Sequence, residues 1–480
     1  MQYDIIIVGA GLGGLTAGAK LAKEGRKVMI LEQHDRPGGC ATTFRRKDFT
    51  MEVGLHEMDG LHRADPKTKI FNDLGIMEKV VFLELPEFYR FVNEQHDIVV
   101  PHNPEEAKKI LLKSFPDEEE GIEKYFYNVL NSRKIMKESR GQKNKNVGEF
   151  LDEISNNEDL KLVLLGNLGY FHDDPYTLSY FYYITAQGAY YNGKANFIKG
   201  GSQKLSDALM DIIIENGGTV NLNSIVTKIN FKNDVPSSVS YRETKAKEQI
   251  EYNDEAKEII INSSIPNLAK DLLPQEIGKK LLSTIEDNKI GASLLTVYYG
   301  FKKSLKEVGN PNYSTFIYHD SVKNQKDILS NNHSDFDTRS LTLVDYSHVD
   351  SDLAPAGKSV GAVCCVDYPS DWEGLSKDEY KKKKAYVAEV ITARCDKLIP
   401  GFRDAVEYVE VATSLTVKRY TLNPKGAVYG FAQNPDKPTE YLSVLPDNIH
   451  IASAWGKFGG GFSGAIISGY MTAFGILRKG

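Results

Sequence analysis

Residues 4 to 14 read Asp4-Ile5-Ile6-Ile7-Val8-Gly9-Ala10-Gly11-Leu12-Gly13-Gly14, and this stretch decides the fold. Its β-branched run is typical of a strand buried on both faces of a parallel sheet. Gly9, Gly11 and Gly14 then have Gly-x-Gly-x-x-Gly spacing, and the alanine-rich residues that follow predict a helix. In such a turn the second glycine lets a pyrophosphate approach the backbone, and the third lets helix and strand pack closely. The sequence therefore predicts a βαβ unit that binds an ADP group.

The next predicted strand supplies the acidic residue that this unit needs. Lys27 to Leu31 has strand character, and Glu32 follows it, 23 residues after Gly9. An acid at this distance is where a dinucleotide-binding unit hydrogen-bonds the ribose. A glycine triplet alone could be a structural turn, but the strand, helix and acid around it favour the binding interpretation.

Composition bounds the function further. The chain has 480 residues, 41% hydrophobic and 26% charged, which is ordinary globular usage. A net charge of −6 argues against nucleic acid as a partner. The four cysteines (Cys40, Cys364, Cys365 and Cys395) form no disulfide framework or zinc spacing, so we expect a reducing compartment and no metal. No removable leader is evident and no apolar run approaches the ~20 residues of a membrane span, so we expect a cytoplasmic protein that contacts the inner face of a membrane, if at all, peripherally.

Two more segments fit the same plan. Near the C-terminus, Asn448 to Ala454 alternates like a strand, and the glycines 459–461 lead into an apolar helix that reaches Leu477. In the middle, Lys199 to Leu205 opens a helix that ends at Asn216-Gly217-Gly218, and Thr219 to Ile229 returns as a strand pair. The cofactor-binding part of the chain is therefore expected to be discontinuous.

The loop Arg36-Pro37-Gly38-Gly39-Cys40-Ala41-Thr42-Thr43-Phe44 resembles the extended FAD-binding signature of the amine oxidase and phytoene desaturase superfamily. Lys47 to His56, the end of a later strand at Asn262-Ser263-Ser264 and the C-terminal glycine motif are similar to the carotenoid desaturase, carotenoid isomerase and retinol saturase branch. The sequence Ser453-Ala454-Trp455 departs from relatives, which often carry an acidic or polar residue there.

This resemblance implies an α/β fold with a Rossmann-like FAD-binding domain of the glutathione reductase type, made of residues 1–75, 195–290 and 410–480. An inserted α+β substrate domain would comprise residues 76–194 and 291–409. FAD is the implied cofactor. The implied cofactor-binding residues are Gly9, Gly11, Leu12, Gly13, Gly14, Glu32, Gln33, Arg36, Gly38, Gly39, Cys40, Ala41, Thr42, Gly54, Leu55, His56, Val226, Ser263, Trp455, Gly460, Gly461, Phe462, Ser463 and Ala465.

The aromatic stretch from Tyr170 to Tyr191 is the expected substrate region. Aromatic side chains suit the flat face of a polyene, although helix core is an equal alternative. Tyr180, Tyr183 and Tyr190 are the substrate candidates. No catalytic residue can be identified, and His56 is a candidate whose alternative is a structural role. The polar segment Asp320 to Ser340 is expected to be a loop or a lid.

The implied function is FAD-dependent oxidation, reduction or isomerisation of carbon–carbon double bonds in an apolar conjugated polyene or isoprenoid. The direction of electron flow and the electron partner stay open. One alternative is a flavin oxidase of amines or porphyrinogens. Another is a non-redox chaperone for prenyl lipids, similar to the Rab GDP-dissociation inhibitors.

Overall fold

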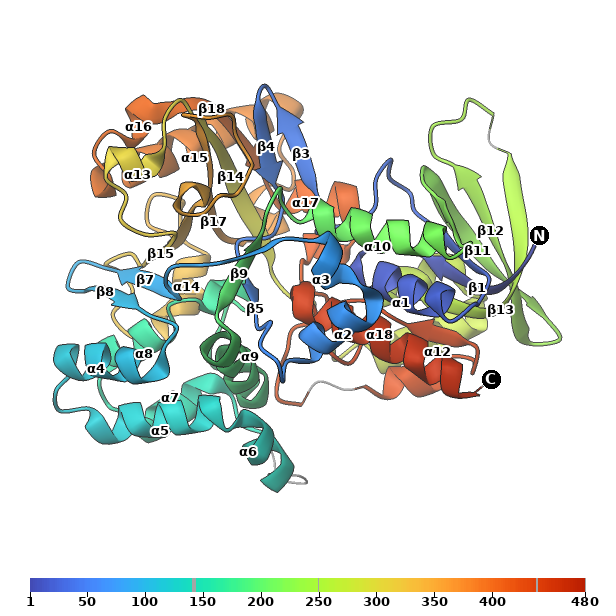
Figure 1. Ribbon diagram of the computed structural model, residues 1–480, viewed down its shortest axis with the longest axis horizontal. Helices are drawn as coiled ribbons and strands as arrows, with labels where there is room; N and C mark the ends of the chain where they lie inside the picture. Colours follow the sequence, from blue (N-terminus) through green and yellow to red (C-terminus); the bar gives the residue numbers. More distant parts are fainter. Residues whose placement is uncertain (140–143, 249, 437–438, 480) are drawn as a thin grey trace.

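The computed structural model describes residues 1–139, 144–248, 250–436 and 439–479. The chain forms two lobes, each built on a seven-stranded sheet, and both termini lie at the end of the molecule that carries the first sheet (Figure 1). In the part of the chain that the structure describes, no helix has both the length and the apolar character of a membrane span.

The first sheet has the order β10-β2-β1-β13-β12-β11, with β19 also paired to β13. Strands β10, β2, β1, β13 and β19 run parallel, and β12 and β11 add an antiparallel ribbon. Its strands are β1 (Gln2–Val8), β2 (Val28–Leu31), β10 (Thr219–Asn221), β11 (Ser224–Lys232), β12 (Val235–Glu243), β13 (Glu251–Ile261) and β19 (Ile449–Ile451). The predicted βαβ unit and the C-terminal strand are therefore confirmed, and they meet on the two sides of β13.

The second sheet has the order β18-β14-β17-β16-β15-β7-β8 and is antiparallel except where β7 meets β15. Its strands are β7 (Tyr89–Val92), β8 (Asp97–Val100), β14 (Ser293–Phe301), β15 (Ser314–Ile317), β16 (Leu341–Asp345), β17 (Ser359–Asp367) and β18 (Val406–Ala412). Two small sheets join the lobes: β3 (Thr43–Arg46) pairs with β4 (Phe49–Glu52), and β9 (Ala195–Ile198) lies between β5 (Met58–Asp59) and β6 (Phe82–Glu84).

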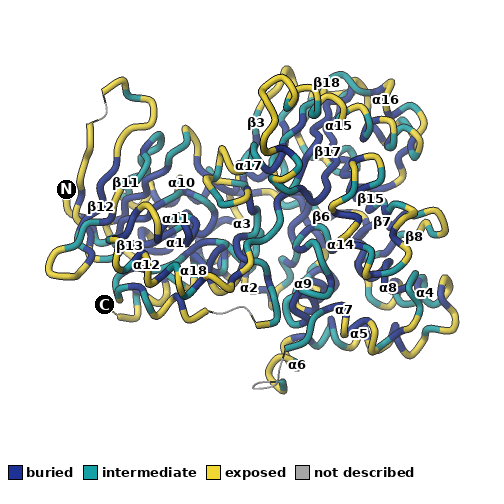
Figure 2. The backbone as a smooth tube through the Cα atoms, turned by 180° about the vertical axis from the view of Figure 1, so that it is seen from behind, coloured by how far each residue is buried: buried dark blue, intermediate teal, exposed yellow. Residues whose placement is uncertain are grey.

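Helices cover both lobes. Near the first sheet lie α1 (Leu12–Lys23), α2 (Pro66–Leu74), α3 (Ile76–Lys79), α10 (Gln203–Glu215), α11 (Ile265–Asn267), α12 (Gln275–Thr284) and α18 (Gly461–Lys479). The remaining helices are α4 (Pro104–Ser114), α5 (Glu119–Leu130), α6 (Ser132–Glu138), α7 (Val147–Ile154), α8 (Glu158–Leu164), α9 (Tyr180–Gly193), α13 (Leu305–Val308), α14 (Asp327–Asn332), α15 (Lys377–Leu398), α16 (Phe402–Ala405) and α17 (Ser414–Thr421). Figure 2 shows α1 and β17 buried, whereas α6 projects from the molecule.

The segment predicted as a polar loop or lid, Asp320 to Ser340, is irregular except for one short helix. Residues Asp327–Asn332 form helix α14, and Asn331 donates to the carbonyl of Thr338 at 2.9 Å. Arg339 is 1% exposed and donates to the carbonyls of Ser334 and Val366. The polar side chains that gave the segment its loop character therefore hold it in place. The division of the chain into two domains at the predicted boundaries stays a prediction.

The N-terminal and C-terminal helices pack with almost no space between them. A Cβ atom added to Gly469 of α18 would lie 2.1 Å from the carbonyl oxygen of Gly13. A Cβ atom on Gly13 would in turn lie 2.0 Å from the carbonyl oxygen of Ala452. Since both obstacles are backbone atoms, neither can move away cheaply. The two ends of the chain are thus fixed together through glycines.

We predict that Gly469→Ala lowers the stability by about 1 to 3 kcal/mol, the usual cost of overpacking. Gly475→Ala is the matched control on the same helix, because nothing lies within 4 Å of its added Cβ. That variant should be neutral, or more stable by about 0.5 to 1 kcal/mol from helix propensity. Thermal unfolding followed by circular dichroism measures both, and equal midpoints for Gly469→Ala and the parent would contradict the close packing.

Candidate active site

One cavity of about 1570 Å³ runs between the lobes. Its walls come from the glycine loop before α1, the first residues of α18, helix α9 and strand β14. Ordinary ligand pockets measure roughly 300 to 1,000 Å³. The space is therefore large enough for a dinucleotide and a second ligand together.

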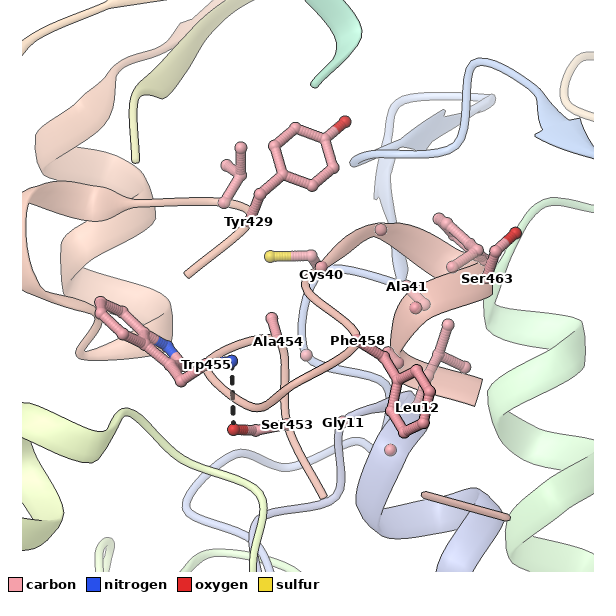
Figure 3. Close-up of a pocket in the computed structure, with 18 of the residues that line it drawn as sticks. Gly11, Leu12, Cys40, Ala41, Tyr429, Ser453, Ala454, Trp455, Phe458 and Ser463 are labelled. Carbon is pink, nitrogen blue, oxygen red and sulfur yellow. Dashed lines mark hydrogen bonds between the residues drawn. The ribbon is translucent and has the colours of Figure 1, made fainter. Parts of the chain in front are cut away.

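Most of the residues predicted to bind the cofactor line this cavity. They are Gly9, Gly11, Leu12, Gly13, Glu32, Gln33, Gly38, Gly39, Cys40, Ala41, Gly54, His56, Val226, Ser263, Trp455, Gly460, Gly461, Phe462, Ser463 and Ala465. Figure 3 shows part of this set, with Gly11 and Leu12 of the first turn close to Ser453 and Ala454 and with Tyr429 across the space. Segments more than 400 residues apart in sequence therefore share one site.

Four residues predicted to bind the cofactor do not line the cavity: Gly14, Arg36, Thr42 and Leu55. Gly14 acts in packing, because its Cβ would lie 2.3 Å from the carbonyl oxygen of Gly9. The guanidinium of Arg36 donates to the carbonyl of Thr43 at 2.9 Å and pairs with Asp35. Thr42 donates to the Gln203 side chain, and Leu55 is fully buried.

The structure also changes the reason for glycine at position 11. The sequence pattern assigns Gly11 to the approach of a pyrophosphate. A Cβ added there would lie 2.5 Å from Oδ1 of Asn262, which follows β13. Asn262 also donates to the carbonyl of Ala452 before the C-terminal turn. Packing inside the protein thus already calls for glycine at position 11, and its role toward a pyrophosphate stays a prediction.

Two features of the cavity fit a dinucleotide. Helix α1 begins after Gly11 with no side-chain cap, so its first N–H groups are available to an anion. Glu32 is 7% exposed and accepts from the N–H groups of Ala10 at 2.7 Å and His34 at 2.9 Å. Its carboxylate is thereby held at the wall, with further lone pairs that can accept from ribose hydroxyls.

The C-terminal end of the site is anchored by an ion cluster. Ser463, in the first turn of α18, donates to Asp59 of β5. Lys67 is 2% exposed and lies 3.2 Å from both Asp59 and Asp65. This cluster ties the first turn of α18 to α2 and β5. Ser263 also lines the cavity, and its buried hydroxyl has no hydrogen-bond partner among the described residues, so it is available to a ligand.

The tyrosines of α9 divide into two groups. Tyr190 lines the cavity, whereas Tyr180 and Tyr183 do not. Tyr183 donates to the carbonyl of Leu164 at 2.7 Å, and Tyr180 donates to Asn128 of α5. For these two tyrosines the structure favours the core interpretation over a substrate wall.

An aromatic wall lies beside the C-terminal turn, and one of its members, Tyr429, was not identified from the sequence. Tyr429 lines the cavity, and a Cβ on Gly461 would touch its ring at 3.4 Å. Tyr170, Phe171, Tyr182 and Tyr298 line the same space. Tyr429 lies in an irregular segment, so no periodic pattern in the sequence marks it. The available signal was indirect: the glycines 459–461 have no side chains and therefore leave room for a bulky neighbour.

His56 lies inside the cavity wall in a neutral environment. Its Nδ1 is 3.8 Å from Sγ of Cys364, and its ring is 5.5 Å from the ring of Tyr170. Burial lowers the pKa of His56 to about 4, so the imidazole is uncharged at neutral pH. Cys364 and Cys365 are adjacent on β17 and therefore point to opposite faces of the sheet. Cys365 packs in the hydrophobic cluster of the second sheet, away from His56. No group of side chains suited to a metal ion occurs among the described residues.

Comparisons with known proteins agree with this geometry. Residues 12–477 match the family described as flavin containing amine oxidoreductase. The chain is 24% identical to an all-trans-retinol 13,14-reductase of Danio rerio, over 89% of this chain and 77% of that protein. It is 26% identical to a chloroplastic prolycopene isomerase of Daucus carota, over 89% and 72%. It is 24% identical to a 4,4'-diapophytoene desaturase of Methylomonas sp, over 92% and 88%.

Solved structures share the fold at low identity. An oxidoreductase from Methanosarcina mazei has a TM-score of 0.70 at 16% identity, with full coverage of both chains. Putrescine oxidase bound to putrescine has a TM-score of 0.65 at 15% identity, covering 100% of this chain and 99% of that one. With a family match over nearly its whole length and a cavity that fits the cofactor, the chain belongs to the flavin containing amine oxidoreductase family and is an FAD-dependent oxidoreductase.

Proposed function

We propose that this enzyme acts on the carbon–carbon double bonds of an apolar conjugated polyene or isoprenoid. The observation that carries the proposal is the continuity of the cavity, which passes from the glycine loop to the aromatic wall of Tyr170, Tyr182, Tyr190 and Tyr429. An extended apolar chain leaves water favourably, at about 25 cal/mol per Å² of apolar surface buried, and needs few polar anchors. Relatives named as a retinol reductase, a prolycopene isomerase and a diapophytoene desaturase support the same substrate class.

The cofactor roles that we propose follow the cavity from one end to the other. Glu32 and Gln33 bind the adenosine ribose, and Val226 lies against the adenine. The first turn of α1, with Gly11, Leu12 and Gly13, receives the pyrophosphate. The residues expected to border the flavin are Gly39, Cys40, Ala41, Gly54, His56, Trp455, Gly460, Gly461, Phe462, Ser463 and Ala465, all of which line the cavity.

FAD supplies hydride transfer when bound, and the protein aligns the substrate and excludes water. The aromatic side chains opposite the C-terminal turn would hold the polyene flat against the reacting position. The first turn of α18 directs its N–H groups and helix dipole toward the same region, which favours negative charge there. These roles require no protein nucleophile.

One alternative fits the site less well, and a second is separated from the proposal only by turnover. A chaperone for prenyl lipids has no need of the uncapped α1 terminus and the glycine loop, both of which are intact. An amine oxidase also uses aromatic side chains around its flavin, and only turnover separates it from a polyene enzyme. The experiments below therefore include an amine.

Helix α6 borders the cavity where an apolar substrate could enter. The cavity reaches Arg133, Lys134 and Met136 on α6, the helix that projects from the molecule. All three are exposed, and they combine basic and apolar side chains. We propose that α6 marks the entrance for an apolar lipid at the inner face of a membrane or on a carrier, in a cytoplasmic protein.

Glu32→Ala is predicted to weaken the retention of FAD. The variant loses a charged acceptor for the ribose, a contribution of roughly 1.5 to 3 kcal/mol, which corresponds to about a tenfold to hundredfold weaker affinity. Flavin content after dialysis, with Glu24→Ala at the C-cap of α1 as control, measures the effect. A Glu32→Ala protein that holds FAD as tightly as the parent would contradict the ribose assignment.

Polyene turnover is predicted under anaerobic stopped-flow observation. A retinoid or carotenoid should reoxidise the reduced enzyme, or a more saturated one should bleach the oxidised enzyme. An isomerase would instead change the geometry of the polyene without net flavin redox change. If a panel of such lipids changes neither the flavin spectrum nor the polyene, while a soluble amine reduces the flavin rapidly, the substrate class is wrong and the amine oxidase alternative replaces it.

A further inference from the structure

Glu57 is a buried acid at the cavity wall that the roles above leave unused. It lies between His56 and β5, lines the cavity and is 9% exposed. Neither of its carboxyl oxygens has a hydrogen-bond partner among the residues that the structure describes. Buried polar groups nearly always find partners in folded proteins, so this exception indicates a functional group or a ligand contact.

The groups around this carboxyl offer it no positive charge. The hydroxyl of Tyr190, a residue of α9 that also lines the cavity, acts on this carboxyl as a hydrogen-bonding neighbour but lies outside ordinary hydrogen-bond geometry. The other titratable groups that act with it are Glu87, Asp59, Tyr170 and Tyr313, from the segments around β5 to β7, before α9 and before β15. The adjacent His56 is neutral because burial lowers its pKa to about 4. The nearby cation Lys67 is engaged by Asp59 and Asp65.

These surroundings favour the acid form of Glu57. Burial, together with the negative charge of Glu87 and Asp59, raises the pKa of Glu57 well above its ordinary value. Other buried acids of the region differ in having donors. Glu87 accepts from the N–H of Tyr313 at 2.6 Å, and Glu52 accepts from two groups of Ser202, each at 2.7 Å. Glu57 alone among these three has no donor in hydrogen-bond geometry that would hold it ionised.

We infer that Glu57 is the proton source of the cavity and passes its proton through the Tyr190 hydroxyl to a carbon of the bound polyene. The inference rests on the proposed function and favours addition of hydrogen or isomerisation over desaturation. Addition of hydrogen to a double bond requires a hydride at one carbon and a proton at the other, and the hydride is the part that reduced flavin supplies.

The bonds to hydrogen that break and form in this transfer are balanced between Glu57 and Tyr190. The O–H bond of Tyr190 breaks as the new C–H bond forms, and the Glu57 proton moves to the Tyr190 oxygen. Glu57 is left as a carboxylate, and a proton from water restores the acid before the next turnover. Burial also raises the pKa of Tyr190 well above its ordinary value, so the hydroxyl is a poor acid unless its proton is replaced at once.

The protonation state of Glu57 before the reaction distinguishes the possible reactions. Reduction of a double bond, or isomerisation by transient protonation, starts from a carboxylic acid. Desaturation starts from a carboxylate that can accept a proton. A site that holds Glu57 protonated is therefore prepared for hydrogen addition or isomerisation, and it is in the wrong form for desaturation.

Infrared spectroscopy of the FAD-loaded enzyme tests the protonation directly. At about pH 8.5 acids with ordinary or moderately raised pKa values are ionised, including Glu52, whose pKa burial raises to about 7. The protonated-carboxyl band that remains should disappear in Glu57→Gln and persist in Glu87→Gln, the matched control. A band that survives in Glu57→Gln, or no band in the parent, overturns the inference even if polyenes are turned over.

Turnover in heavy water tests the delivery. The product should carry one solvent-derived deuterium for each double bond reduced, and Glu57→Gln and Tyr190→Phe should slow its formation by about 100-fold or more at unchanged flavin content. Glu87→Gln should stay within a few-fold of the parent. A Glu57→Gln enzyme as fast as the parent overturns the inference while the proposed function stands. A parent enzyme that holds the infrared band yet converts no polyene refutes the proposed function, and the donor role is then refuted with it.

Discussion

The close approach of backbone segments at the glycine loop is the constraint on which the rest of this structure depends. Gly9, Gly11 and Gly13 have no room for a Cβ atom, because Asn262 after β13 and Ala452 after β19 occupy that space. The first turn of α1 is therefore clamped by segments about 250 and 440 residues further along the chain. A site built at this junction exists only when the middle and both ends of the chain have folded together.

The acids near the cavity show how one fold gives carboxyl groups different tasks. Glu52 is 1% exposed and satisfied by backbone and side-chain donors that join β4 to the start of α10. Glu32 has two backbone donors and keeps accepting capacity for a ligand. Glu57 has no such donor, and burial raises its pKa well above the ordinary value. The number of donors, more than burial itself, separates a structural acid from one that can bind or transfer a proton.

Sequence reasoning succeeded where the signal is local and failed where it depends on tertiary packing. The strand, glycine turn and acid of the first βαβ unit follow from a short pattern. The sequence could not show which tyrosines of α9 line the cavity and which lie in the core, because aromatic residues occur on both sides of this helix. Glu57 was hidden for a related reason, since a missing partner is visible only when all neighbouring elements are in place.

The central claim is that FAD and an apolar polyene occupy one continuous cavity side by side. The most direct measurement is a titration of the flavin-loaded protein with a non-reacting polyene, followed by the absorption of both chromophores after gel filtration. The account predicts one flavin and one polyene retained per chain, with the flavin spectrum perturbed by its new neighbour. Release of flavin as polyene binds, or retention of flavin with no polyene at all, would contradict it.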